Sequence, residues 1–213
     1  MMQIFLHELR LVLREPRFWI PFLFPPVLLI IMQIVILSQY GVAGHVFEPK
    51  LLMTVGGLLA TISVTLTADS FAGERERNTL ELLLCLPITL RQLFFGKLFA
   101  LLPVPLVLSG LALTLLWVLS HQDLDVLIKS LLFSASLCLL ITGISLQVSL
   151  FAQTVRSAAQ ANVLFVLVFL VLTQMVAEQY LATWFWPLLV FPVALLVFAG
   201  LVMLSLQRFQ KMN

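Results

Sequence analysis

The chain has 213 residues, of which 62% are hydrophobic and only 10% are charged, and its mean hydropathy is +1.11. Soluble domains carry roughly 25% charged residues, so this composition excludes a protein whose whole surface faces water and indicates that lipid surrounds most of the chain. The formal net charge of +2, with no dense basic stretch, gives no sign of nucleic-acid binding.

The first seventeen residues mix charged and apolar side chains before the first long apolar run. They do not fit a cleavable signal peptide, which has a short basic start, a brief apolar core and a small-residue cleavage site. The segment MMQIFLHELRLVLREPR instead predicts an amphipathic helix at 1–17 that lies on the membrane surface before the chain turns inward.

Six apolar runs follow, each close to the roughly 20 residues that a membrane-spanning helix needs. They predict an all-α membrane protein with six transmembrane helices in a single domain, 1–213, because the connections are too short to fold by themselves. The predicted spans are at about 18–38, 51–70, 98–120, 130–151, 158–177 and 182–206.

The basic residues divide unequally between the two sides of this topology. Only Lys50 and Lys129 lie on one side, and ten basic residues lie on the side that holds both termini. Because cytoplasmic segments carry an excess of Lys and Arg, both termini are predicted to be cytoplasmic, in a cell (inner) membrane. The ten are Arg10, Arg14, Arg17, Arg75, Arg77, Arg91, Lys97, Arg156, Arg208 and Lys211.

The largest predicted cytoplasmic connection is 73–97, GERERNTLELLLCLPITLRQLFFGK. Asn78 is a good N-cap and Glu81 completes a capping box, so a short helix is predicted to begin there. Pro87 ends that helix, because the residue before a proline leaves helical geometry. A second capping box at Thr89 predicts another helix, which continues into the third span.

This stretch resembles the segment between the second and third spans of type-2 ABC transporter permeases. The family's pattern has acidic and basic residues, then Gly-Thr-Leu-Glu, a Leu pair, a Pro, and a Gly-Lys at the next span. The sequence departs from it at Asn78, where the family often has Gly. The N-terminal ELRLVLREPRFWIPFLFPPVLL also resembles the family's interfacial helix and first span. The matching residues are Glu74, Arg75, Glu76, Thr79, Leu80, Glu81, Leu83, Leu84, Pro87, Gly96 and Lys97.

The resemblance implies that the connection contains a coupling helix that docks in a cleft of a separate cytoplasmic ATPase. It also implies two permeases, either two copies or a copy and a similar subunit, with a pair of ATPases that hold ATP and Mg. This chain would bind no cofactor, because Gly96-Lys97 is followed by Leu98 rather than the Ser or Thr of a P-loop. The alternative is a plain interfacial helix whose charges face water. The residues expected to contact the ATPase are Glu74, Arg75, Glu76, Arg77, Asn78, Thr79 and Glu81.

Two predicted spans, the second and the fourth, carry a stripe of small and hydroxylated residues at intervals of three and four. Residues at this spacing share one helical face. Such a face either lets neighbouring helices approach closely or lines the route of a substrate. The candidates for lining a route are Thr54, Thr61, Thr65, Ser134, Thr142 and Ser145.

Together, the residues and the resemblance predict the transmembrane subunit of an ATP-driven exporter. Its substrate would be hydrophobic or amphipathic, such as a drug, a lipid-linked molecule, a peptide or a haem-like group. No hydrolase or metalloprotease motif indicates an enzyme. Two other functions stay open: a membrane scaffold or sensor that recruits a cytoplasmic partner, and an ATP-independent channel or carrier.

Overall fold

The computed structural model describes residues 31, 49–79, 90–120 and 122–211 of the chain. Every regular element in these ranges is a helix, which confirms the all-α prediction for this part of the chain. The predicted interfacial helix at 1–17, nearly all of the first span and the stretch 80–89, with Glu81 and Pro87, lie outside the described residues.

The second predicted span is a rod of four consecutive helical pieces. These are α3 (Pro49–Ala60), α4 (Ile62–Ala68), the π-helix η1 (Asp69–Gly73) and α5 (Glu74–Glu76). Thr61 separates the first two, and both its N–H (3.1 Å) and its hydroxyl (2.6 Å) donate to the carbonyl of Leu58. This tighter local pattern replaces one turn of regular α-helix.

The remaining spans form five helices. The third predicted span is broken into two helices next to Pro103, which has no N–H to donate and so interrupts the hydrogen-bond ladder. The helices are α7 (Leu90–Leu101), α8 (Pro103–Ser120), α9 (Leu124–Phe151), α10 (Val155–Ala182) and α11 (Phe185–Lys211).

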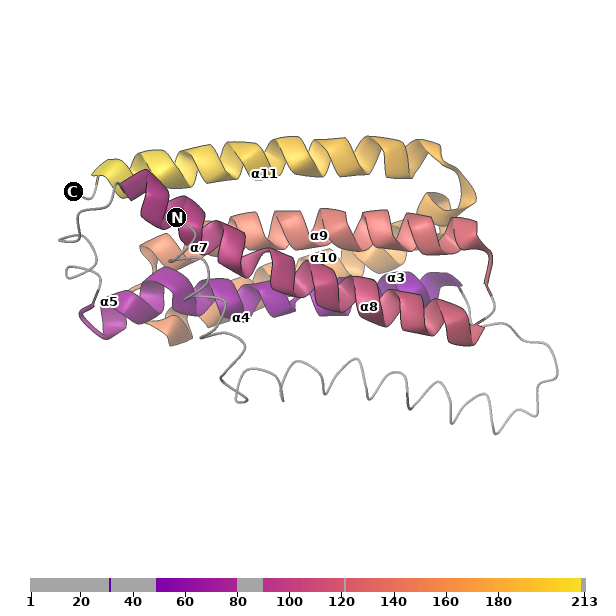
Figure 1. Cartoon of the computed structure of the whole chain (residues 1–213), viewed down its shortest axis with the longest axis horizontal. Coiled ribbons are helices and arrows are strands. Elements are labelled where there is room, and N and C mark those ends of the chain that lie inside the picture. Colours follow the sequence, from indigo (N-terminus) through magenta and orange to yellow (C-terminus); the bar gives the residue numbers. More distant parts are fainter. Residues whose placement is uncertain (1–30, 32–48, 80–89, 121, 212–213) are drawn as a thin grey trace.

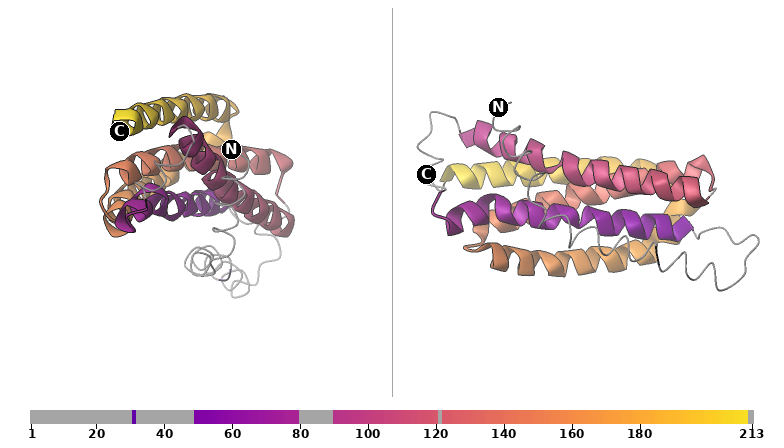
Figure 2. Two further views of the ribbon diagram at one scale, coloured as in Figure 1. Left: turned by 60° about the vertical axis from the view of Figure 1, so that its left-hand side comes forward. Right: turned by 60° about the horizontal axis from the view of Figure 1, so that its bottom comes forward.

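The helices run side by side along the long axis of the molecule, with α11 at one edge (Figures 1 and 2). The helix α9 packs against α3, α4, α8, α10 and α11, so it is the axis of the bundle. One apolar core cluster joins α3 to α8, and a second joins α3, α4, α9 and the carboxyl-terminal part of α10 at Tyr180. Burial of these apolar side chains against α9 holds the bundle together.

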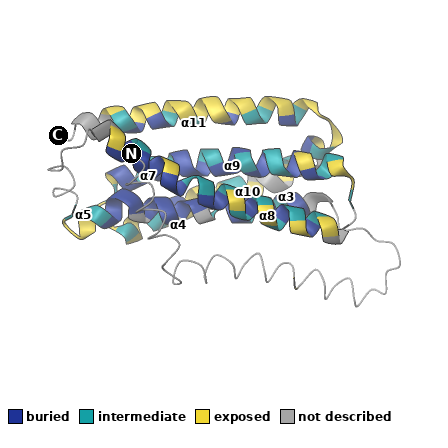
Figure 3. Ribbon diagram, in the orientation of Figure 1, coloured by how far each residue is buried: buried dark blue, intermediate teal, exposed yellow. Residues whose placement is uncertain are grey.

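Three helical stretches in the described residues are long and apolar enough to cross a membrane. They are Gln92–Val118, Leu124–Phe151 and Phe185–Gln207, and they correspond to the third, fourth and sixth predicted spans. The helix α11 exposes most of its surface (Figure 3), and its exposed side chains include Leu188, Leu196 and Met203. An apolar exposed surface of this kind fits a lipid environment.

Candidate functional site

The charged turn, residues 74–79, lies at one end of the bundle, directly after the π-helix η1 (Figure 1). The hydroxyl of Ser149, on α9, accepts from the N–H groups of Phe71 (3.2 Å) and Ala72 (3.1 Å). It also donates to the carbonyl of Ala68 at 3.2 Å. These bonds supply backbone groups of a wide helical turn with a side-chain partner, and π-helical turns are frequent at functional sites.

Asn78 ends the rod in a Schellman motif. Its φ of 55° is left-handed, its N–H donates to Arg75 O at 3.1 Å, and the N–H of Thr79 donates to Glu74 O at 2.9 Å. Only Gly and, less often, Asn readily adopt this conformation at the end of a helix. In the described residues Asn78 terminates a helix, while the helix that it was predicted to begin lies outside the described residues. The Gly that the resembling family often has at this position already indicated a helix end with a left-handed φ.

Glu74 forms an ion pair with Lys97 of α7, whose side chain is 2% exposed. The ammonium group of Lys97 also donates to the carbonyl of Ser70 at 3.1 Å and lies 5.4 Å from the ring centroid of Phe71. A buried ammonium group requires such partners, because water cannot reach it. The rod and α7 are thus joined through one buried lysine.

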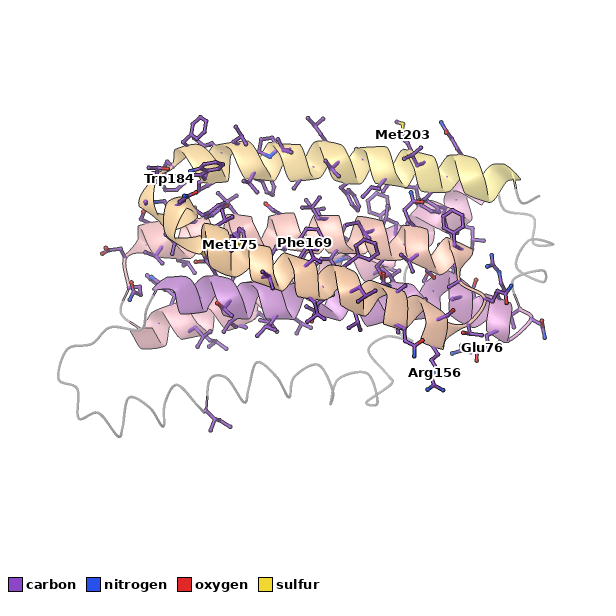
Figure 4. The ribbon with its side chains drawn as sticks, turned by 180° about the vertical axis from the view of Figure 1, so that it is seen from behind. Glu76, Arg156, Phe169, Met175, Trp184 and Met203 are labelled. Atoms are coloured by element: carbon purple, nitrogen blue, oxygen red, sulfur yellow. The ribbon has the colours of Figure 1, made fainter. Side chains whose placement is uncertain are left out.

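Arg75 and Glu76 bind the ends of two other helices. The guanidinium of Arg75 donates to Leu150 O (3.1 Å) and Ala152 O (2.8 Å), at the carboxyl end of α9. The carboxylate of Glu76 accepts from the N–H of Val155 at 3.0 Å, at the amino end of α10. Each charge has the sign that its helix end favours. Figure 4 shows Glu76 at this end, near Arg156 of α10.

The structure therefore places three predicted ATPase contacts, Glu74, Arg75 and Glu76, against their own chain. Arg77 and Asn78 are exposed, and the hydroxyl of Thr79 donates to Glu74 O at 3.2 Å. Contact with an ATPase stays a prediction for all of these residues and for Glu81. The internal partners Lys97 and Ser149 were missed as functional residues, although Lys97 was part of the Gly-Lys match.

The polar stripe of the fourth predicted span packs against the second predicted span, at residues outside the second span's own stripe. The hydroxyl of Ser134 donates to Gly56 O at 3.2 Å, and a Cβ added to Gly56 would lie 3.1 Å from that of Ser134. This close approach of α3 and α9 is the geometry that small residues permit. The contact supports the packing interpretation for Ser134.

A buried polar node joins α4, α9 and α10 nearer the charged turn. The hydroxyl of Ser145 contacts that of Thr67, donates to Val64 O at 3.2 Å and accepts from Asn162 Nδ2 at 2.7 Å. Asn162 is 1% exposed, and sequence analysis did not select it as a candidate. Such interhelical bonds hold spans together in an apolar environment.

Two of the other stripe candidates have partners within their own helical segment. Thr142 donates to Cys138 O at 2.6 Å within α9, and Thr61 donates to Leu58 O. Thr54 is half-buried on α3, and Thr65 belongs to α4. A role in lining a substrate route stays a prediction for all six candidates.

A second buried lysine lies at the opposite end of the bundle. Lys129 of α9 donates to Leu181 O at 2.8 Å and forms an ion pair with Asp125 at 2.7 Å. Its ammonium group lies 5.2 Å from the ring centroid of Trp184, in the connection between α10 and α11. Lys129 thereby fixes the carboxyl end of α10 to α9.

A model of the ABC-2 family of transporter proteins matches residues 2–185. Because the match covers most of the chain, the protein belongs to the ABC-2 transporter family. It is a multi-pass membrane protein, a permease with a transport role in an ABC system. A search of curated proteins found no match.

Proposed function

We propose that this chain is the transmembrane subunit of an ATP-driven exporter in the inner membrane, with six spans and both termini in the cytoplasm. A pair of ABC ATPases, which hold ATP and Mg, would act on a pair of such permeases. The observation that carries the proposal is the charged turn, because its side chains are bonded to α7, α9 and α10 at one end of the bundle. A turn bonded in this way passes a displacement to three spans.

The charged turn also has a surface for a partner. While its first three side chains bind the chain itself, Arg77 and Asn78 remain exposed beyond them. Glu81, which follows in the sequence, completes the proposed docking segment. Charged and polar groups at the rim of an interface guide association and set its specificity.

The distribution of charge supports a cytoplasmic position for this end. Four basic residues, Arg75, Arg77, Lys97 and Arg156, belong to the charged turn or to the adjoining ends of α7 and α10. The opposite end has Lys50, at the start of α3, and Lys129, whose charge is matched by Asp125. This asymmetry fits the positive-inside rule.

The proposed cargo is a hydrophobic or amphipathic molecule: a drug, a lipid-linked molecule, a peptide or a haem-like group. The described helices expose extensive apolar surface on α10 and α11, as at Leu164 and Leu196. Such surface is suited to lipid or to a second permease. The short connections favour export, since they provide no domain to capture a substrate from outside.

The test is co-purification of the tagged full-length chain from its native membrane, followed by assay of ATP hydrolysis. Arg77→Glu and Glu81→Arg are expected to reduce the co-purified ATPase at least about tenfold, as loss of interface contacts does. Asp123→Lys, an exposed site at the opposite end, is the matched control and should leave the amount unchanged. Equal recovery of ATPase with all three variants would contradict docking at the charged turn.

Orientation is tested with single cysteines at the same two ends. An impermeant maleimide should label Asn78→Cys only in inside-out vesicles and Asp123→Cys only in intact spheroplasts. The reverse pattern would overturn the proposed topology. A complex that hydrolyses ATP but moves no cargo through the permease would instead indicate a scaffold.

A further inference from the structure

Lys97 is the point at which α7 is attached to the charged turn. We infer that Lys97 is a positioning residue for transport, whose buried ion pair with Glu74 makes α7 follow the charged turn when an ATPase displaces it. This inference rests on the proposed function and adds to it the residue through which α7 is moved.

The surroundings of Lys97 make this attachment hard to separate. Its side chain is 2% exposed and that of Glu74 is 15% exposed, so little water is available to replace either partner. The ammonium group also has the carbonyl of Ser70 at 3.1 Å. Moving the turn away from α7 would leave a buried charge without its counter-ion, which is strongly unfavourable. The favourable response is for α7 to move with the turn.

Aromatic packing next to the ion pair fixes the relative position of the same two elements. The rings of Phe71, on η1, and Phe94, on α7, are stacked with centroids 6.0 Å apart. Both side chains are buried, with 1% and 0% of their surface exposed. The ion pair therefore lies beside a tight apolar contact. Together the two contacts hold η1 and α7 in a fixed relative position.

The other two attachments of the turn differ from this one. Arg75 is half-buried and Glu76 is exposed, and both bind backbone groups at helix ends. Water can replace such partners at modest cost, because exposed ionic contacts contribute little. Among the described residues, the Lys97–Glu74 ion pair is therefore the attachment of the charged turn that is shielded from water.

The test uses the intact complex of the chain with its co-purifying ATPase in lipid nanodiscs. A bimane fluorophore on Gln92→Cys, at the exposed start of α7, reports movement as a shift in emission on addition of ATP and vanadate. Cys85→Ser and Cys138→Ser remove the native thiols. Met203→Cys on α11 (Figure 4) is a second reporter, on a helix that none of the bonds given above for the described residues joins to the charged turn but whose Val202 packs in the apolar cluster of Phe71 and Phe94.

Lys97→Met is expected to reduce the ATP-induced shift at Gln92→Cys at least about threefold, while ATPase recovery and hydrolysis stay within about twofold. Lys97→Arg, which keeps the charge, should retain at least half of the shift. Lys129→Met removes a similar buried lysine at the far end and should leave the shift intact. The shift at Met203→Cys should differ less between the Lys97 variants than the shift at Gln92→Cys, because α11 contacts this region through apolar packing.

An assembled Lys97→Met complex with a full shift would overturn the inference alone. If Lys97→Met does not assemble, the reversed pair Glu74→Lys with Lys97→Glu decides the matter: assembly with a restored shift supports the inference, and assembly without it overturns the inference. A wild-type chain that binds no ATPase would overturn the proposed function, and the inference with it.

Discussion

The two ends of the bundle each contain a buried lysine. Lys97 and Lys129 are 2% and 3% exposed, and each donates to a backbone carbonyl, pairs with a carboxylate and lies near an aromatic ring. The carboxylates differ. Glu74 comes from another span and is 15% exposed, whereas Asp125 is one turn earlier on the same helix and is 43% exposed. At one end, therefore, Lys97 links two helical segments through a side-chain ion pair. At the other end, Lys129 links two helices through a hydrogen bond to a backbone carbonyl.

The largest expected effect is at the Lys97 end. Lys97→Glu places two carboxylates in one buried site, and the free energy of unfolding should fall by about 3–5 kcal/mol. The measurement is SDS-induced unfolding in mixed micelles, followed by tryptophan fluorescence. Adding Glu74→Lys to the same chain should recover most of the loss, and a cost below about 1 kcal/mol would show that the pair is not buried.

Lys129→Met should cost less, about 2 kcal/mol, in the same unfolding assay. It removes the charged hydrogen bond to Leu181 O and the contact with the ring of Trp184, but leaves Asp125 in contact with water. Lys129→Arg is the control that keeps the charge. A loss as large as that of Lys97→Glu would remove the distinction between the two ends.

Asn78→Ala should destabilise the Lys97 end by about 1 kcal/mol, because Ala is unfavourable at a left-handed φ. Asn78→Gly should cost nothing, since Gly adopts this conformation freely. The unfolding assay compares the two variants. Equal stability of both would contradict the Schellman motif.

Asp125→Asn should have the smallest effect, below about 0.5 kcal/mol, because exposed ion pairs in one helix contribute little. In this variant Lys129 keeps its hydrogen bond to Leu181 O and its contact with the ring of Trp184. The difference measured at low salt should become smaller at high salt, because salt screens an exposed ion pair. A cost above about 2 kcal/mol would indicate that Asp125 acts as Glu74 does.

The sequence predicted the general architecture because hydropathy and charge are properties of each segment. The apolar runs anticipated α8, α9 and α11, and the stripe on α9 anticipated a face buried against other helices. The break at Thr61 was not anticipated, since no proline marks that position. Its bonds to Leu58 depend on a local geometry that periodicity does not report.

Long-range pairing explains what the sequence did not predict at the candidate site. Ser149 lies almost eighty positions from the N–H groups that it binds, and Arg75 is similarly far from Ala152. Tyr180 of α10 is 0% exposed, and its ring centroid lies 4.9 Å from that of Phe133 on α9. Such neighbours come from other spans, so only the assembled bundle determines them.

The hydroxyl of Ser149 has a consequence for the direction in which the charged turn faces. A π-helical stretch contains one residue more than the α-helical turn it replaces, and one residue corresponds to roughly 100° of rotation about the helix axis. If η1 relaxed to an ordinary α-helix, the carboxylate of Glu74 would point away from Lys97 by about a quarter of a circle. The direction in which the described residues of the charged turn face therefore depends on the hydroxyl of Ser149, which binds the backbone of the π-helix.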